Sequence, residues 1–421
     1  MARRPGVTGA IVMTVGAAHL SGAADPAGRA VTVALLADGL PVASRQFVDQ
    51  DEGALEAALR QAIDAYALVV VLAGAGGAAG EIVRRTLARV TATRLVLNER
   101  LLHALAEVFR REDRAMPRRA ERLGLLPQGA TLWTVPSGEP GWLLETAGAG
   151  IVVLPARDSA LRELLDRHLL PYARERFRSK DAVLVRTLRA VGVAAAEIEE
   201  RLASFLGHEG EAAVTCMPVD DEVWVRIRAR APSLALATDL LARVEAEVAA
   251  RLGPDRYGSD ADTLERVVGS LLLDRGLTLS VAESCTGGLL GHRITNVPGS
   301  SAYFERGVMV YSNRAKQELL GVPESVLRAH GAVSAQCAEA MARGISVLAG
   351  TACGLAVTGI AGPEGGSAAK PVGTVFVGLT VAGETGARRF RFAGDRESVK
   401  WQSSQMALDM LRRALLARTR S

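Results

Sequence analysis

The chain has 421 residues, of which 49% are apolar, and its 50 basic and 46 acidic side chains give a formal charge of +4. This length and apolar content indicate a globular chain with several buried cores and about three domains. Arginine and glutamate are interspersed, so the charge pattern offers no basic tail for nucleic acid. The four cysteines lack CxxC spacing and indicate neither a zinc site nor a disulfide framework, which makes a reducing cytoplasm the simplest compartment.

The first 177 residues alternate apolar strands with helical stretches. An apolar run at 11–15 ends at Gly16, and we interpret it as a strand because it is too short and interrupted for a signal peptide. The elements expected after it are a strand at 31–36, a helix at 52–65, a strand at 68–72, a helix from Glu81 and a strand at 151–154. This order favours a parallel α/β sheet. No apolar run is long enough to span a membrane.

The pattern changes after the charged stretch 174–180. A small α+β domain of about eighty residues follows, with a strand at 184–188, a helix at 193–206, an alternating strand through Val223, Val225 and Ile227, and a helix at 234–252. It ends near Gly253 and Pro254. We therefore expect an α/β protein with three domains, at residues 1–177, 178–256 and 257–421.

The last third returns to alternating helices and strands. We expect a helix at 263–275, a strand at 278–282, a helix at 334–348, a strand at 355–358, a hairpin of 373–381 with 387–392 across 383–386, and a final helix after Asp395.

Ser284 is the strongest candidate nucleophile, because it lies in a small, glycine-followed turn directly after a predicted strand. A serine hydroxyl attacks only when a base removes its proton. Lys316 can act as that base if burial keeps it neutral, and Tyr311 can relay or hold the proton, so either could be the immediate base. Taken singly, Ser284 could be a helix cap and Tyr311 a buried tyrosine. Their joint occurrence favours catalysis.

The turn also offers donors for a negatively charged oxygen. The backbone N–H groups of Cys285, Thr286, Gly287 and Gly288 precede an apolar run that predicts a helix, so they should point from a helix N-terminus toward an oxyanion. Cys285 is a rival nucleophile, although a cysteine directly after a strand is more often core filler.

Residues 260–418 resemble the C-terminal domain of the CinA family, a nicotinamide mononucleotide deamidase (PncC-type) domain, through AESCTGG, PGSSAYFERGVMVYSN, AKQELLGV, HGAVS, AVTGIAGPEGG, KPVGTVFVGL and FAGDRE. The resemblance implies hydrolysis of the carboxamide of nicotinamide mononucleotide to the acid and ammonia, in pyridine nucleotide salvage. Ser284, Tyr311 and Lys316 fall on the family's catalytic positions. The resemblance also suggests a homodimer, and we expect deamidation to need no metal or other cofactor.

Three further residues are candidate substrate contacts. Thr358 and Gly359 close a predicted strand in a glycine-rich loop, where a plain turn is the alternative. Arg396 follows the probable cap Asp395 and places positive charge at a helix N-terminus, which an anionic partner such as the nucleotide phosphate would explain. Simple solvent exposure of Arg396 is the alternative.

The N-terminal 177 residues resemble the family's amino-terminal domain, which has the fold of molybdopterin-binding proteins and is associated with ADP-ribose pyrophosphatase activity. LLPQGAT and LLPYARERF agree, but the functional positions do not. Pyrophosphate hydrolysis needs carboxylates that hold a divalent metal, and of the family's set only Glu81 remains. We therefore expect that the metal site and the hydrolase are lost, unless Asp25 and Asp158 compensate.

The middle segment resembles the family's KH-like linker domain. Its GxxG pattern at 207–210 contains Glu209, which would repel phosphate. Three arginines and a tryptophan share one strand and could bind single-stranded nucleic acid, but a solvated face is the better interpretation: Trp224, Arg226, Arg228 and Arg230. Two rival functions stay open, namely a nucleotide-binding or scaffolding protein in competence or DNA repair, and an ADP-ribose pyrophosphatase acting through the N-terminal domain.

Overall fold

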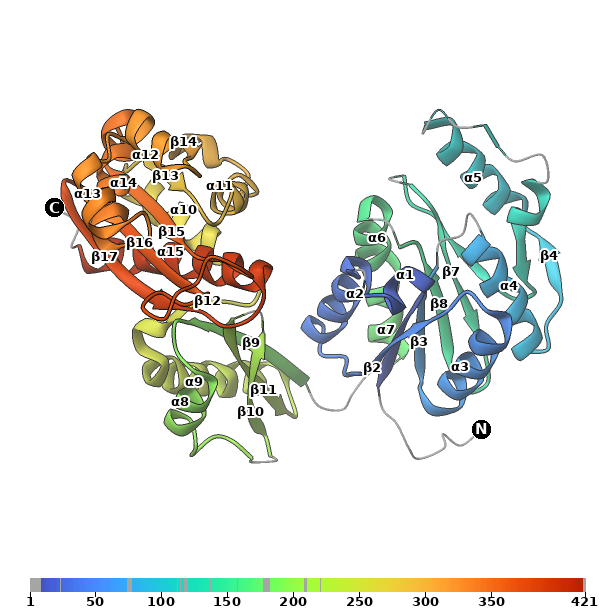
Figure 1. Ribbon diagram of the computed structural model, residues 1–421. Coiled ribbons are helices and arrows are strands. Elements are labelled where there is room, and N and C mark those ends of the chain that lie inside the picture. The colour runs from blue at the N-terminus through green and yellow to red at the C-terminus, as the bar shows by residue number, and fades with distance from the viewer. Residues whose placement is uncertain are drawn as a thin grey trace. The chain divides into compact units, whose positions relative to one another are not determined.

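A computed structural model describes residues 9–418 apart from positions 23, 74–77, 112, 114, 117–119, 137, 157, 177–181, 208–209 and 220 (Figure 1). The chain forms two compact units. One comprises Met1–Val185 and Ala229–Thr238, and the other comprises Arg186–Arg228 and Asp239–Ser421.

The N-terminal domain is built on a six-stranded mixed sheet. Its strands, in spatial order, are β2 (Val42–Val48), β1 (Ala10–Val15), β3 (Leu68–Leu72), β8 (Gly150–Leu154), β7 (Gly141–Glu145) and β6 (Thr131–Trp133). The first four are parallel, as predicted, whereas β7 and β6 run antiparallel. The few residues between β7 and β8 suffice only for a hairpin, because a parallel crossover needs about a dozen residues or more.

Helices cover both faces of this sheet and bury two apolar clusters. They are α1 (Ala17–Leu20), α2 (Pro26–Ala37), α3 (Glu52–Ala65), α4 (Ala78–Val90), α5 (Glu99–Arg111), α6 (Asp158–Leu164), a π-helical turn at Leu165–Leu169, and α7 (Leu170–Arg176). A short 3₁₀ turn at Ala120–Gly124 leads into β5 (Leu125–Pro127), which pairs antiparallel with β4 (Leu95–Leu97) in a separate two-stranded sheet.

The strand expected at 31–36 is wrong, because these residues belong to α2. The Asp25 carboxylate caps the helix by accepting the Gly28 N–H, and Pro26 occupies its first position. Val31 and Leu35, four residues apart, are buried against the sheet while Val33 is 56% exposed. Helical spacing therefore decides the structure over the strand preference of valine.

The linker domain is a four-stranded sheet with two helices. The strands lie in the order β10 (Ala212–Val219), β11 (Glu222–Ala231), β9 (Ala182–Val191) and β12 (Arg256–Ser259), and the helices are α8 (Ala195–Arg201) and α9 (Leu234–Leu252). The α+β prediction is confirmed. Helix α8 is shorter than the expected 193–206, since the chain turns after Arg201.

The C-terminal domain has a five-stranded sheet in the order β14 (Phe304–Met309), β13 (Leu279–Glu283), β15 (Cys353–Gly359), β16 (Thr374–Val381) and β17 (Glu384–Arg391). Strands β14, β13 and β15 are parallel, and β16 and β17 are antiparallel. Its helices are α10 (Leu264–Asp274), α11 (Leu289–Thr295), α12 (Asn313–Leu320), α13 (Glu324–His330), α14 (Ala335–Ala349) and α15 (Arg396–Ala417).

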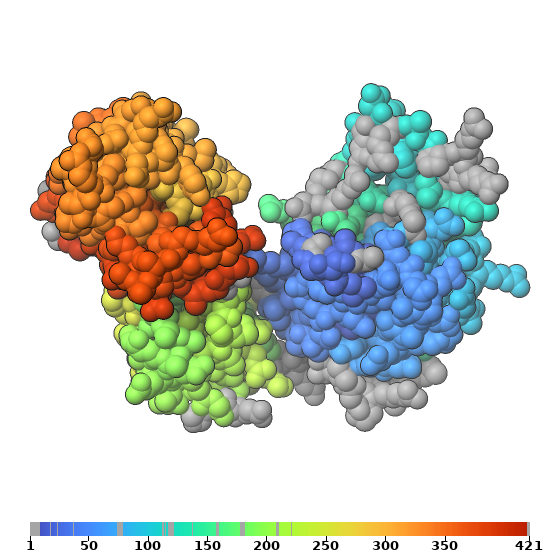
Figure 2. Space-filling model, in the orientation of Figure 1, coloured from blue at the N-terminus to red at the C-terminus, as the bar shows by residue number. Residues whose placement is uncertain are grey.

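Each face of this sheet has its own core. Leu355 and Val357 pack with α10, α11 and α15, whereas Ala356 between them packs with α12 and α14. Side chains that alternate between two apolar cores produce the continuous apolar runs of these strands. In the space-filling view the atoms of the last third, orange to red, pack as one continuous body (Figure 2).

The hairpin prediction is right in its strands and wrong in its turn. The turn lies at Ala382 and Gly383, both with positive φ (49° and 89°), and β17 begins at Glu384. Two central residues with positive φ form the tight turn that matches strand twist. The three-domain α/β architecture expected from the sequence is present. Within the described ranges, every helix is too short or too polar to cross a membrane.

Candidate active site

The candidate site lies where the three parallel strands of the C-terminal sheet end. Ser284 follows β13, Tyr311 follows β14, and the loop at 360–362 follows β15. Since these strands are parallel neighbours, their carboxyl ends meet at one edge of the sheet. Ligands of open α/β sheets bind at this edge.

Ser284 and Lys316 are in direct contact. The Nζ of Lys316 lies 3.0 Å from the Oγ of Ser284 and 2.7 Å from the carbonyl oxygen of Val310. Both side chains are buried, and Lys316 is only 1% exposed. Burial lowers the pKa of Lys316 from its ordinary value. The pair thus places a lysine that tends toward the neutral form beside the serine hydroxyl.

The local sequence fixes the position of Lys316. Ser312 is the N-cap of α12, and its side chain accepts the Ala315 N–H at 3.1 Å. This cap starts the helix so that Lys316 occupies its first turn and points inward.

Tyr311 lies at the rim of the site. Its side chain is 68% exposed, and its hydroxyl accepts a hydrogen bond from Arg396 at 3.2 Å. In the described part of the chain, no hydrogen bond joins Tyr311 to Ser284 or Lys316. The structure therefore brings Ser284 and Lys316 together and groups Tyr311 with Arg396.

Glu283 is a site residue that the sequence analysis missed. Its buried carboxylate accepts the N–H groups of Gly288 at 3.0 Å, Leu290 at 3.1 Å and Gly291 at 2.8 Å, which are the first donors of α11. The expectation that Gly288 offers its N–H to an oxyanion is corrected, because that donor is occupied. A glutamate directly before a turn that opens a helix is the sequence signal for such a cap.

Three amides of the turn remain as donors for an anion. Ser284 donates its own N–H to Val357. No hydrogen bond from the N–H groups of Cys285, Thr286 or Gly287 to another backbone group occurs in the described ranges. The Cys285 side chain is buried, and burial raises its pKa to about 12. A thiol that stays protonated is a poor rival to the serine.

The other predicted substrate contacts have structural roles in this state. The Thr358 hydroxyl, 1% exposed, donates to the Ala332 carbonyl at 2.9 Å. A Cβ on Gly359 would lie 2.6 Å from the side chain of Val375, so glycine permits close packing of β15 on β16. Arg396 donates to the Gly362 carbonyl at 2.7 Å and to Tyr311, which ties two loops of the edge together.

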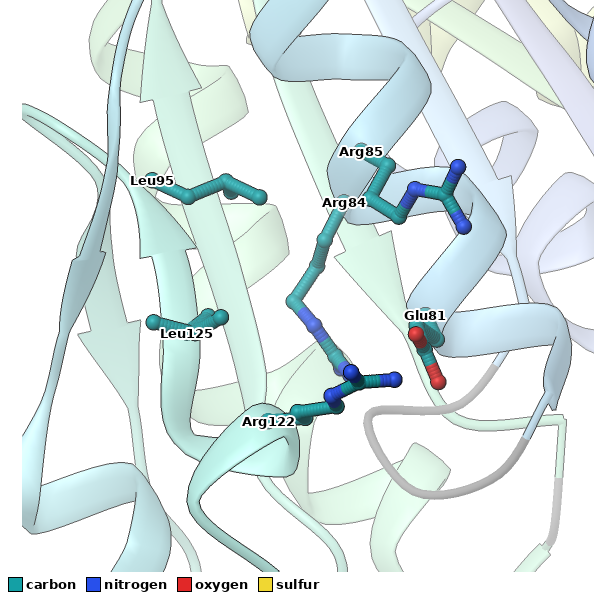
Figure 3. Close-up of a pocket in the computed structure, with 6 residues that line it drawn as sticks. All are labelled: Glu81, Arg84, Arg85, Leu95, Arg122 and Leu125. Carbon is teal, nitrogen blue, oxygen red and sulfur yellow. The ribbon is translucent and has the colours of Figure 1, made fainter. Parts of the chain in front are cut away.

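The N-terminal domain has a cavity of about 280 Å³ beside Glu81 (Figure 3). It is lined by Glu81, Arg84, Arg85, Leu95, Arg122 and Leu125. The side chain of Arg84 projects from α4 toward Arg122, and Glu81 lies alongside (Figure 3). Three guanidinium groups around one carboxylate do not fit a divalent cation.

Of the two alternative carboxylates, the structure describes the side chain of Asp25. Asp25 is occupied by the Thr14 hydroxyl, the Gly28 N–H and Arg45, at 2.9, 2.9 and 2.6 Å. Asp158 begins α6, and its side chain lies outside the described residues, as do positions 74–77 of the loop before Glu81.

In the linker domain Trp224 is engaged internally. Its ring N–H donates to Glu222 at 2.9 Å, and the guanidinium of Arg189 lies 4.4 Å from the ring centre. A tryptophan covered in this way is not an open stacking platform for bases. His208 and Glu209 of the GxxG pattern lie outside the described residues.

Three family-wide sequence profiles match the chain in the order of its domains. "Probable molybdopterin binding domain" matches residues 11–175, "Damage-inducible protein CinA KH domain" matches 185–258, and "CinA C-terminal domain" matches 261–415. A competence-damage inducible protein of Moorella thermoacetica is 40% identical over 364 residues, which cover 85% of this chain and 88% of the relative. The chain belongs to the CinA family.

A further relative agrees with this membership. A CinA-like protein of Geobacter sulfurreducens is 38% identical over 406 residues, covering 96% of this chain and 98% of the relative. A solved structure of a competence-damaged protein (CinA) superfamily protein from Klebsiella pneumoniae is 36% identical, with a TM-score of 0.36, and covers 37% of this chain and 100% of its own. These names state the CinA family and not a reaction.

Proposed function

We propose that the C-terminal domain hydrolyses the carboxamide of nicotinamide mononucleotide to the acid and ammonia, with Ser284 as nucleophile and Lys316 as base. The observation that carries the proposal is the 3.0 Å contact between Lys316 Nζ and Ser284 Oγ, inside a buried site that lowers the pKa of the lysine. The substrate identity rests on the resemblance of the sequence to the deamidase domain of the CinA family.

The carbonyl of Val310 gives the lysine a defined orientation. A neutral amine has two N–H groups and one lone pair, so one N–H donates to Val310 while the lone pair faces the Ser284 hydroxyl. This arrangement supports Lys316, rather than Tyr311, as the immediate base.

The reaction then proceeds in two balanced halves. The Ser284 proton passes to Lys316 as Oγ bonds to the amide carbon, and the Lys316 ammonium returns the proton to the leaving nitrogen as the C–N bond breaks and ammonia departs. Water attacks the resulting ester, with Lys316 taking its proton and giving it back to Ser284 Oγ. The amides of 285–287 are the donors available to the negatively charged oxygen in both halves.

Ammonia release from nicotinamide mononucleotide tests this proposal. We expect turnover by the full chain and a loss of at least about 1000-fold in Ser284→Ala. Cys285→Ala is the matched control, because it changes the neighbouring nucleophilic atom and should keep most of the activity. Chelator should leave the rate unchanged. A Cys285→Ala protein as inactive as Ser284→Ala would contradict the assignment of the nucleophile.

We also propose that the N-terminal domain no longer hydrolyses ADP-ribose. Arg84 beside Glu81 and the fully engaged Asp25 support this loss of a divalent metal site. Release of AMP from ADP-ribose by the full chain would show that the domain still acts as a hydrolase.

A further inference from the structure

Lys400 faces the serine turn but has no assigned role. It lies on α15, one helical turn after Arg396, so both side chains lie on the same face of the helix. Its Nζ is 3.8 Å from the position that a Cβ on Gly287 would take. The side chain is half-buried. Helix α15 therefore brings a cation to the turn that carries the nucleophile.

The two cations of this face differ in their partners. Arg396 is held by the Gly362 carbonyl and the Tyr311 hydroxyl. Lys400 makes neither a hydrogen bond nor an ion pair to any residue that the structure describes. A half-buried ammonium without a counter-charge favours an anion from outside the chain.

The chemistry of the substrate indicates which anion this is. Nicotinamide mononucleotide has a positively charged pyridinium ring next to the reacting amide and a negatively charged phosphate at its other end. A cation beside the ring would be repelled, whereas a cation beside the phosphate is attracted. Gly287 has a positive φ of 61° and no side chain, so no Cβ lies between the turn and the Lys400 ammonium, and a phosphate oxygen can reach that ammonium.

We infer that Lys400 binds the phosphate of the mononucleotide and selects it over the unphosphorylated riboside, while Arg396 is a positioning residue that holds Tyr311 and the loop at Gly362. This inference rests on the proposed deamidation. It assigns the phosphate contact to the neighbouring lysine in place of Arg396, whose guanidinium is held by Gly362 and Tyr311.

The test compares kcat/KM for nicotinamide mononucleotide and nicotinamide riboside in the full-length protein and in Lys400→Met and Lys400→Arg. We expect Lys400→Met to lose about 10- to 100-fold with the mononucleotide, mainly in KM, and to be unchanged with the riboside. Lys400→Arg should retain most of the preference. An equal loss with both substrates, or no loss with the mononucleotide, would overturn the inference.

A binding measurement separates this inference from the proposed reaction. Calorimetric titration of Ser284→Ala and of Ser284→Ala/Lys400→Met with the mononucleotide and the riboside needs no turnover. Weaker binding of the mononucleotide alone in the double variant supports the phosphate contact even if the wild-type protein releases no ammonia. Equal binding of the mononucleotide by both proteins refutes it, whether or not the wild type is active.

Discussion

The contact between Ser284 and Lys316 could be expected from the sequence. Ser284 follows β13 and Lys316 lies on the helix after β14, and the carboxyl ends of parallel neighbouring strands lie at the same edge of a sheet. Tyr311 also follows such a strand, yet its side chain turns outward to Arg396. The direction of a loop side chain depends on contacts with distant residues, here α15, which local spacing does not encode. The capping role of Glu283 was not predicted for a similar reason. Its three backbone donors come together at the carboxylate only when α11 has formed.

The lowered pKa of Lys316 predicts a pH dependence. Only the neutral amine accepts the Ser284 proton, so kcat/KM should rise with pH through the lowered pKa and level off before the ordinary value of 10.5. Lys316→Arg should stay inactive at every pH, because a guanidinium remains protonated. Rates of the wild type and this variant between pH 6 and 10 check the prediction. A flat wild-type profile would contradict a lysine base.

The same shift affects stability. Between the lowered pKa and 10.5 the unfolded chain binds more protons at Lys316 than the folded chain does, so the free energy of unfolding should rise with pH across that window. Lys316→Met should lack this rise. Thermal unfolding at several pH values measures it, and an identical pH dependence in both proteins would refute the assignment of the shift to Lys316.

Among the elements, helices and strands could be predicted where the spacing of apolar residues and the capping residues indicate the same structure. The helix at 52–65 and the strand at 68–72 occur with the expected bounds. The strand prediction at 31–36 failed because its five apolar residues resemble a strand when the cap at Asp25 is overlooked. The expected parallel sheet lacks the antiparallel strands β6 and β7, because strand direction follows from connection length and sheet position, which the apolar pattern of single strands does not contain.

The cap of α11 gives a prediction at this scale. Glu283→Gln replaces a carboxylate that accepts three N–H groups by an amide with one acceptor oxygen, which should cost about 1.5–3 kcal/mol of stability and misplace the serine turn. Calorimetric unfolding and kcat measure the two effects. The control is Glu305→Gln, whose half-exposed carboxylate pairs only with Arg306 among described residues. Equal stability of the two variants would contradict the capping role.

At the scale of the whole molecule, the linker domain and C-terminal domain share a buried ionic network. Asp409, 1% exposed, accepts hydrogen bonds from Arg412 at 2.6 Å and from Arg413 at 2.6 Å. Arg412 also donates to the Pro254 carbonyl at 2.7 Å, and Arg413 donates to Asp255 at 2.9 Å. Helix α15 thus connects the segment that ends the linker domain to the helix turn that carries Arg396 and Lys400.

This network predicts an asymmetry between single and double variants. Asp409→Leu leaves the buried Arg412 without its carboxylate and should cost about 3–5 kcal/mol, whereas Asp409→Leu/Arg412→Leu removes both charges and should cost less. Calorimetry of the full chain compares them. A double variant that is less stable than the single variant would show that the pair itself, rather than an isolated charge, decides the stability.

In the proposed mechanism Ser284 and Lys316 act as one unit, and a double-mutant comparison of deamidation is the sharpest test of that unit. We would measure kcat for ammonia release from nicotinamide mononucleotide in the wild type, Ser284→Ala, Lys316→Ala and the double variant. If the lysine acts only through the serine, the double variant should be about as slow as Ser284→Ala, because the second change removes nothing further. Additive losses, or an active Lys316→Ala, would contradict the account.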